Sequence, residues 1–293
     1  MRAVRGRMAV LALAAAASAA CSINLDAAQY VNKEEKSFAV TGKAEVVLKT
    51  FDGSIELAAW DKSQVAVTIQ REAGNQADAN ELKVTAEQVG NRIVIEAVKP
   101  ENRTEIGWNN GRSVSFIVHV PKTTDVTASS GDGSITATGV DGTVTLKSGD
   151  GSIKAASLTG DVTIHTGDGS IDAENITGGL NMSTGDGSMS ITGAPKSLRA
   201  HSGDGSVHVD VGSASRADGD WDISTGDGSV TVTLPGGFNA QLDAHTGDGD
   251  ISAEDFGLRP SNDSKNDLRG VIGSGGPTLR IRSGDGSIHL SKH

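Results

Sequence analysis

The sequence has little of three residue types on which most globular enzymes rely. Among its 293 residues, one is cysteine, six are proline and 3% are aromatic. A single cysteine excludes any disulfide within the chain. Large rings usually dominate enzyme cores and ligand pockets. Their scarcity predicts a core of small aliphatic side chains arranged in thin layers.

A basic excess is also missing. The chain contains 26 Lys and Arg against 37 Asp and Glu, which gives a formal net charge of −11. An acidic surface repels the phosphates of nucleic acid and of anionic lipid. We therefore expect no nucleic-acid partner and no electrostatic adhesion to a membrane.

Residues 1–20 have the pattern of an export signal peptide. Three arginines precede an apolar run, Met8 to Ala20, whose 13 residues are too few to span a bilayer. Cys21 follows small residues directly, as the lipid-modified cysteine of bacterial lipoproteins does. This pattern predicts lipidation of Cys21. The alternative is ordinary cleavage, which would leave a free N-terminal cysteine.

A lipid on Cys21 would attach the chain to a membrane outside the cytoplasm, in the bacterial cell envelope. Ser22 follows the cysteine in place of an Asp, which favours the outer membrane in a cell that has one. Removal of residues 1–20 takes away three arginines and no acid, so the net charge changes from −11 to −14.

We expect the mature protein to be a monomer.

The rest of the chain is dominated by glycine and by one repeated motif, Gly-Asp-Gly-Ser. Five copies follow one another at steps of 18 residues, starting at Gly131 and ending with the copy at Gly203. Further copies start at Gly226, at Gly247 (as Gly-Asp-Gly-Asp) and at Gly284. A fixed period of this length is typical of stacked supersecondary units.

Each period contains two short strands with alternating apolar residues and two glycine-bearing turns. One such unit cannot bury its apolar face alone, but stacking units about 4.8 Å apart joins those faces into a continuous core. The pattern predicts an all-β fold: a single-stranded, right-handed parallel β-helix (β-solenoid) with rungs of about 18 residues and Gly-Asp-Gly-Ser turns. We expect the copy at Gly284 to close the stack.

The repeat pattern predicts three parts in the chain that follows the signal peptide. Residues 21–36 are the lipidated cysteine and a flexible tether, residues 37–123 are irregular β-rungs, and residues 124–293 are regular repeats. Residues 37–293 form one continuous domain. Within the irregular part, residues 44–50, 64–69, 92–96 and 113–120 read as strands. Residues 72–82 are a loop or a short helix, and residues 254–276 are an irregular excursion.

The motifs resemble a known family. A lipoprotein-like start, the stretch from Gly53 to Val67, a Val120-Pro121-Lys122 step and serial Gly-Asp-Gly-Ser copies are together similar to the DUF4097 family of bacterial β-strand-repeat proteins, often labelled "putative adhesins". The resemblance extends over about residues 38–291. It implies a β-helix outside the cytoplasmic membrane and supplies no catalytic residue.

The motif aspartates should form a ladder along one edge of the stack. Asp-Gly suits a tight turn with positive φ, and this structural role is the simpler interpretation. Stacked carboxylates repel one another, so Ca²⁺ between rungs is the alternative, as in a calcium-binding β-roll. The candidate calcium ligands are Asp132, Asp150, Asp168, Asp186 and Asp204.

No catalytic constellation stands out from the repeats. His165, His201 and His245 precede their motifs by two residues, and two rungs separate the first two, which is too far for one zinc ion. There is no nucleophile elbow, phosphate loop or Cys/His cluster. A β-helix enzyme acting on polysaccharide would use unrepeated acids, and only residues 254–267 offer them. We expect no enzyme and no cofactor.

The sequence therefore predicts a non-enzymatic, lipid-anchored envelope protein that acts as a structural or adhesive binding module. Its partner would be an envelope protein or a glycan. Trp108 lies in a Gly-Asn-rich segment and is a candidate contact for such a partner. Trp60 and Trp221 are expected to seal the core at irregular rungs.

Overall fold

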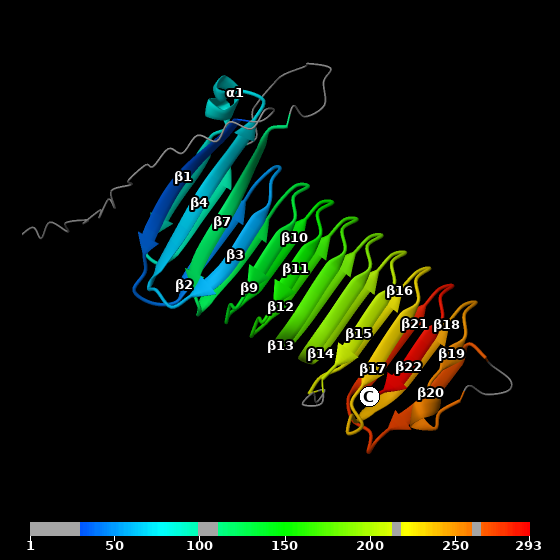
Figure 1. Cartoon of the computed structure of the whole chain (residues 1–293). Helices are drawn as coiled ribbons and strands as arrows, with labels where there is room; N and C mark the ends of the chain where they lie inside the picture. The colour runs from blue at the N-terminus through cyan, green and yellow to red at the C-terminus, as the bar shows by residue number, and fades with distance from the viewer. Residues whose placement is uncertain (1–29, 99–110, 213–217, 260–264) are drawn as a thin grey trace, which may run out of the picture.

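The structure is a computed structural model that describes residues 30–98, 111–212, 218–259 and 265–293. Cys21, Trp108 and the signal peptide lie outside these residues. The described chain is all-β, with almost no helix, and its strands stack side by side along one long axis (Figure 1). Among the described residues, no helix is long and apolar enough to cross a membrane.

Two sheet faces run along the stack, and each regular repeat contributes one strand to each face. We call the pair of strands from one repeat a rung. In spatial order, face A consists of β6 (Arg92–Ala97), β2 (Ala44–Lys49), β8 (Thr124–Ser129), β10 (Val144–Ser148), β12 (Val162–Thr166), the second halves of β13 (Ile171–Thr184) and β14 (Met189–Ser202), β16 (Trp221–Thr225), β21 (Thr278–Ser283), β18 (Ala240–Thr246) and β20 (Asp267–Ile272).

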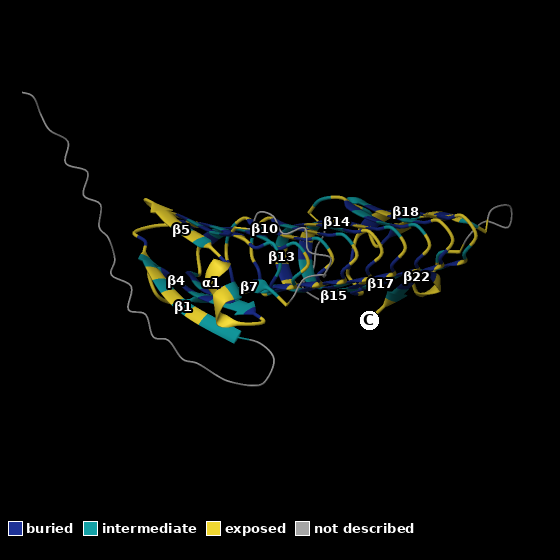
Figure 2. Cartoon of the chain, turned by 90° about the horizontal axis from the view of Figure 1, so that it is seen from above, coloured by how far each residue is buried: buried dark blue, intermediate teal, exposed yellow. Residues whose placement is uncertain are grey.

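Face B is built in the same way from the other strand of each rung. In spatial order, it consists of β1 (Tyr30–Ala39), β4 (Gln64–Ala73), β7 (Ser113–Pro121), β3 (Ile55–Trp60), β9 (Ile135–Thr138), β11 (Ile153–Ala156), the first halves of β13 and β14, β15 (Val207–Val211), β17 (Val230–Leu234), β22 (Ile288–Lys292) and β19 (Ile251–Ser252). Figure 2 shows the two faces as separate layers joined by turns.

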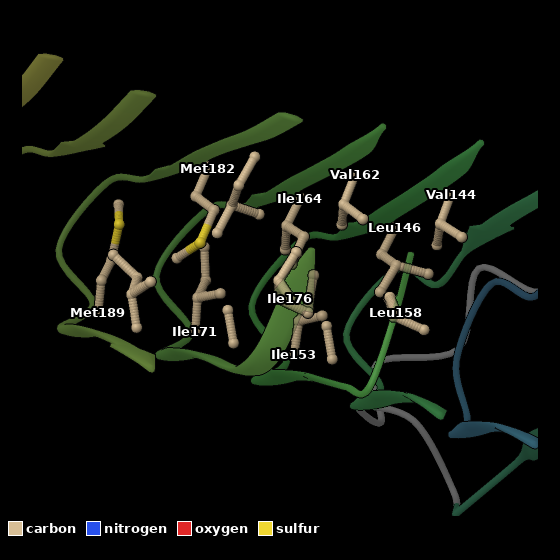
Figure 3. Close-up of a cluster of buried hydrophobic side chains, with 14 of the residues drawn as sticks. Val144, Leu146, Ile153, Leu158, Val162, Ile164, Ile171, Ile176, Met182 and Met189 are labelled. Carbon is tan, nitrogen blue, oxygen red and sulfur yellow. The ribbon is translucent and has the colours of Figure 1, made fainter. Parts of the chain in front are cut away.

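The core is a thin layer of aliphatic side chains between the two faces. In the regular repeats, each strand pairs in parallel with the strand one period away. Val144 is thereby the register partner of Val162, and Ile153 is that of Ile171. These four side chains are at most 1% exposed and point into the space between the faces (Figure 3). Because side chains alternate across a strand, the residues between them point to solvent. Because the layer between the two faces is thin, these aliphatic side chains fill it without large aromatic rings.

The order of rungs in space differs from their order in the sequence. The last copy of the motif does not close the stack, contrary to expectation. Its strands, β21 and β22, lie between the rung of β16 and β17 and the rung of β18 and β19 (Figure 1). At the other end, β2 lies between β6 and β8, and β3 lies between β7 and β9.

Antiparallel strands cover both ends of the stack. At the N-terminal end, β1 pairs with β4, β4 with β7, and β5 (Val84–Val89) with β6. A short helix, α1 (Gln76–Glu81), follows β4, as one of the two alternatives for this segment predicted. At the C-terminal end, β20 pairs antiparallel with β18.

Two predicted segments need correction. The tether was expected to reach residue 36, but β1 starts at Tyr30 and pairs with β4 along ten residues. Its alternation was masked by a run of charged side chains on an edge strand, where both faces tolerate polar residues. The excursion at residues 254–276 contains the short 3₁₀ helix η1 (Glu254–Phe256) and all of β20, whose Leu268 and Ile272 are buried against the core.

Candidate functional site

A buried hydroxyl precedes each copy of the turn motif. Thr166 and Thr184 represent the set: the hydroxyl of Thr166 donates 2.9 Å to the carbonyl of Gly151, and that of Thr184 donates 2.9 Å to the carbonyl of Gly169. Each acceptor belongs to the motif of the preceding rung. The hydroxyl also accepts from an amide of its own turn, as from Gly187 at 3.3 Å. The buried residues of this column are Ser130, Ser148, Thr166, Thr184, Ser202, Thr225, Thr246 and Ser283. The hydroxyl therefore fastens each turn to its neighbour.

The motif glycines are required for close stacking and not for positive φ, which corrects the expected turn chemistry. Among the complete and near-complete copies from Gly131 onward, no motif glycine has a positive φ. A Cβ on Gly169 would lie 2.3 Å from the carbonyl oxygen of Gly151, and one on Gly151 would lie 2.3 Å from that of Gly133. Such distances leave no room for any side chain.

The motif aspartates form the expected ladder on the outer edge of the turns. Asp132, Asp150, Asp168, Asp186 and Asp204 are all exposed. Each carboxylate reaches toward the next rung: a Cβ on Gly149 would lie 3.3 Å from Oδ1 of Asp132. Within the described ranges, no group of three or more His, Cys, Asp and Glu side chains is placed to hold a metal ion. The ladder is thus one carboxylate per turn.

The three histidines lie in one outward column of face A and bond to the strand beside them. His165 Nδ1 is 2.7 Å from the hydroxyl of Ser183, and His201 Nδ1 is 2.9 Å from the hydroxyl of Ser224. His245 is 2.8 Å from the carboxylate of Asp267. All three are exposed, so the column belongs to the solvated face.

Face A is hollowed where the repeat loses its regularity. The hollow has a volume of about 380 Å³ and crosses β12, β13, β14, β16 and β21. Gly179 forms part of its floor, between Asp161 and Ser197 of the neighbouring rungs. We call it the face-A hollow. Its outward row is Thr163, Asn181, Arg199, Asp222 and Arg280.

The two arginines of this row differ in their partners. Arg280 lies 3.8 Å from Asp222 and 3.9 Å from Asp243. The side chain of Arg199 is exposed and, among the described residues, has neither a hydrogen-bond nor an ion-pair partner. An unpaired guanidinium with the amide of Asn181 on one side and the carboxylate of Asp222 on the other is suited to a carboxylate or to sugar hydroxyls.

Sequence reasoning missed this row. Position 199 follows the motif period, but its side chain breaks the series of small polar residues at Thr145, Thr163 and Asn181. Alignment of the outward positions by period would have exposed the change. Only the structure shows that Arg280 continues the same row, because its rung is inserted out of sequence order.

A second hollow, of about 590 Å³, lies at the N-terminal end between β1, α1 and the start of β5. Arg71 crosses it, donating 2.7 Å to Glu34 and 2.9 Å to the carbonyl of Leu82. Burial alone would raise the pKa of Glu34, but hydrogen bonds from Arg71 and Lys36 outweigh it and lower that pKa. These bonds give the hollow a structural role.

Trp60 and Trp221 were both expected to seal the core, and of these Trp221 is fully buried whereas Trp60 is not. Trp221 is 1% exposed and packs edge-on against Phe238, with ring centroids 5.3 Å apart, so it does seal the core. Trp60 is half-buried and stacks on His119 with ring centroids 5.1 Å apart, and its indole N–H donates 2.8 Å to the backbone carbonyl of Gln64.

Solved structures resemble this fold at low sequence identity. A "putative adhesin" from Bacteroides fragilis is 11% identical, with a TM-score of 0.50, and the match covers 89% of this chain and 97% of that one. A "putative cell adhesion protein" from Clostridium sporogenes is 15% identical, with a TM-score of 0.33 and coverage of 90% and 100%. A "putative lipid binding protein" from Parabacteroides distasonis is 14% identical, with a TM-score of 0.38 and coverage of 88% and 96%.

No curated protein matches the chain. The family model described as Toastrack DUF4097 matches residues 39–291, nearly all of the part that the structure describes. The match agrees with the family that the motifs resemble. The chain therefore belongs to the Toastrack DUF4097 family.

Proposed function

We propose that this protein is a non-enzymatic binding module whose ligand occupies the face-A hollow. The observation that carries the proposal is Arg199, an unpaired guanidinium in a polar hollow on an otherwise repetitive face. In a β-solenoid, repeated side chains serve stacking, so side chains that depart from the repeat are the better candidates for recognition. No cofactor and no chemical step is part of the proposal.

The ligand class that fits is a polysaccharide lying across the strands, with a carboxylated sugar at Arg199 and uncharged sugars beside the three aspartates of the lining. Arg199 would pair with a sugar carboxylate, and Asn181, Thr163 and Asp222 would bond to hydroxyls. Arg280 stands two rungs from Arg199, about 9.6 Å at sheet spacing, and is already paired with Asp222 and Asp243, so the sugar carboxylate would lie at Arg199. An envelope protein is the other outcome that a binding experiment would reveal.

The proposed location is the bacterial cell envelope, with lipid on Cys21 as the anchor and the outer membrane as its site. The adhesin name of the Bacteroides fragilis structure is consistent with a surface role. The parallel pairing of successive rungs supports a parallel β-helix for the body, and the strong preference of crossovers for one hand supports right-handed coiling. The exposed body would then present face A to ligands.

The binding role is tested with the soluble body, residues 22–293, on a panel of acidic and neutral polysaccharides. We expect binding to an acidic chain, a large loss of affinity in Arg199→Ala, and partial rescue in Arg199→Lys. Lys147→Ala is the matched control, because Lys147 is an exposed outward cation on face A outside the hollow. Equal binding by wild type and Arg199→Ala would remove the hollow from the proposal, and release of new reducing ends would contradict a non-enzymatic role.

A further inference from the structure

The rung of β21 and β22 is an insertion. The chain leaves β17 and passes beyond the next rung position to form β18 and β19, and only later returns to fill the position it skipped. We call the gap between these two earlier rungs the insertion slot, and residues 278–293 the insert. The strands on both sides of the slot therefore precede the insert in the sequence.

The slot presents the same bonding groups as any rung of the stack. On one side, Gly284 N–H donates 2.6 Å to the carbonyl of Gly226, and the hydroxyl of Ser283 donates 2.9 Å to that of Gly228. On the other side, the Gly247 N–H donates 2.6 Å to the carbonyl of Gly284. Any segment with the motif and its preceding hydroxyl can meet these groups.

The charges of insert and slot are matched, which is a separate observation. Arg282 donates 2.7 Å to the carboxylate of Asp243 and 2.7 Å to its carbonyl. Arg280 stands between Asp222 and Asp243. At the far end of the insert, His293 Nε2 is 2.9 Å from Asp210. The two arginines of the insert thus meet acids of the rungs around it, which selects this copy of the motif.

A glycine-rich segment, which we call the hinge, connects β20 to the insert. Residues 273–277 read Gly-Ser-Gly-Gly-Pro, and Gly273 and Gly275 have φ values of 62° and 79°. Ser274 N–H donates 2.7 Å to the side chain of Asn239, which holds the hinge on the surface. A short hinge of this kind can open and direct its strand to another molecule, the geometry of domain swapping.

We propose that the insertion slot is a strand-insertion site that also accepts residues 278–293 of a second copy of this chain. Reciprocal exchange buries the same Leu279, Ile281, Ile288 and Leu290 as the closed monomer, so the two forms have the same core contacts. The exchanged pair is a two-fold dimer joined at its C-terminal ends. Exchange takes place before the slot has closed on its own insert, during folding at high protein concentration.

The test uses disulfide cross-linking in full-length chains carrying Cys21→Ser. Thr231 of β17 and His289 of β22 are adjacent outward residues in the pairing. One chain carries Thr231→Cys and the other His289→Cys, and the two are refolded together from denaturant at high and low concentration. We expect a cross-linked heterodimer at high concentration and its loss at low concentration. The matched control pairs His289→Cys with Thr136→Cys, an outward residue of the same face far from the slot, and should give none.

A competing peptide, residues 276–293, provides the second measurement. Added during refolding, it should abolish the cross-linked heterodimer, while the same peptide with Gly286→Ala should not, because a Cβ there would lie 2.0 Å from the carbonyl oxygen of Gly228. A heterodimer that equals the Thr136→Cys control, or one that both peptides leave unchanged, would overturn the proposal. The chain carrying Thr231→Cys and His289→Cys together must cross-link internally, which confirms that the pair reports on the slot.

Discussion

The hydroxyl of Thr184 donates a hydrogen bond of 2.9 Å to the carbonyl of Gly169, which lies 15 residues earlier in the sequence and in the preceding rung. The bond is buried and recurs with Ser or Thr at every turn of the regular stack. Together with the side-chain-free glycines, it fixes how closely one turn can rest on another.

Replacement of Thr184 by Val should lower the free energy of unfolding. Val keeps the shape but leaves the Gly169 carbonyl and the Gly187 amide without this partner, at a cost of about 1–3 kcal/mol for an unsatisfied buried group. Thr184→Ser keeps the hydroxyl and should lie close to wild type. Urea unfolding followed by circular dichroism measures both, and equal stability of Val and wild type would show that the hydroxyl ladder is dispensable.

The stacking role of the glycines gives a second mutational test. Gly169→Ala should destabilise the protein by about 1–3 kcal/mol or more, because the new methyl forces neighbouring backbones apart. The Cβ would lie 2.3 Å from the Gly151 carbonyl oxygen. Gly237→Ala is the control, since nothing lies within 4 Å of its Cβ position. If thermal melting shows the two variants to be equal, close stacking does not explain the motif.

Asp243 should make the C-terminal end of the stack sensitive to acid. The hydrogen bond from Arg282, with help from Arg269, holds the pKa of Asp243 below its ordinary value of 3.8. A carboxyl whose pKa is lowered by folding adds stability above its unfolded pKa and loses it as pH falls through the folded pKa. Asp243→Asn should therefore be less stable than wild type at pH 7, and the difference should shrink as the pH falls below about 4.

A double-mutant cycle separates this ion pair from other effects of the substitution. Arg282→Gln should cost more stability in the wild type than in the Asp243→Asn background, because the carboxylate partner is already gone there and only the bond to the Asp243 carbonyl remains to be lost. Equal costs in both backgrounds would mean that the 2.7 Å contact contributes nothing.

The aspartate ladder should make the melting temperature depend on ionic strength, with no additional effect that is specific to calcium. Its carboxylates are exposed, one to each turn, whereas Ca²⁺ takes six to eight oxygen ligands. Screening of their repulsion should raise the melting temperature slightly as ionic strength rises. We expect NaCl and CaCl₂ at equal ionic strength to give the same shift. A larger shift with CaCl₂ that disappears in Asp168→Asn would instead support the calcium alternative.

Much of the regular body could be predicted from local pattern. The period of 18 residues predicted parallel rungs, and alternation within each half-period predicted which side chains point inward, as for Val144 and Ile153. These features depend on neighbours within one rung or on the rung one period away. The irregular ends were harder, because β1, β5 and β20 pair antiparallel and carry polar or charged residues on exposed edges.

The sequence by itself determined the rung: its length, its two strands and its inward residues. Only the tertiary structure decided which rung lies beside which. Each copy of Gly-Asp-Gly-Ser offers the same amides, carbonyls and hydroxyl, so the motif at Gly247 could rest equally well on the motif at Gly226 or on that at Gly284. The choice depends on contacts outside the motif, such as Arg282 with Asp243. The same ordering brings Arg199 and Arg280 into one row, and with it the face-A hollow.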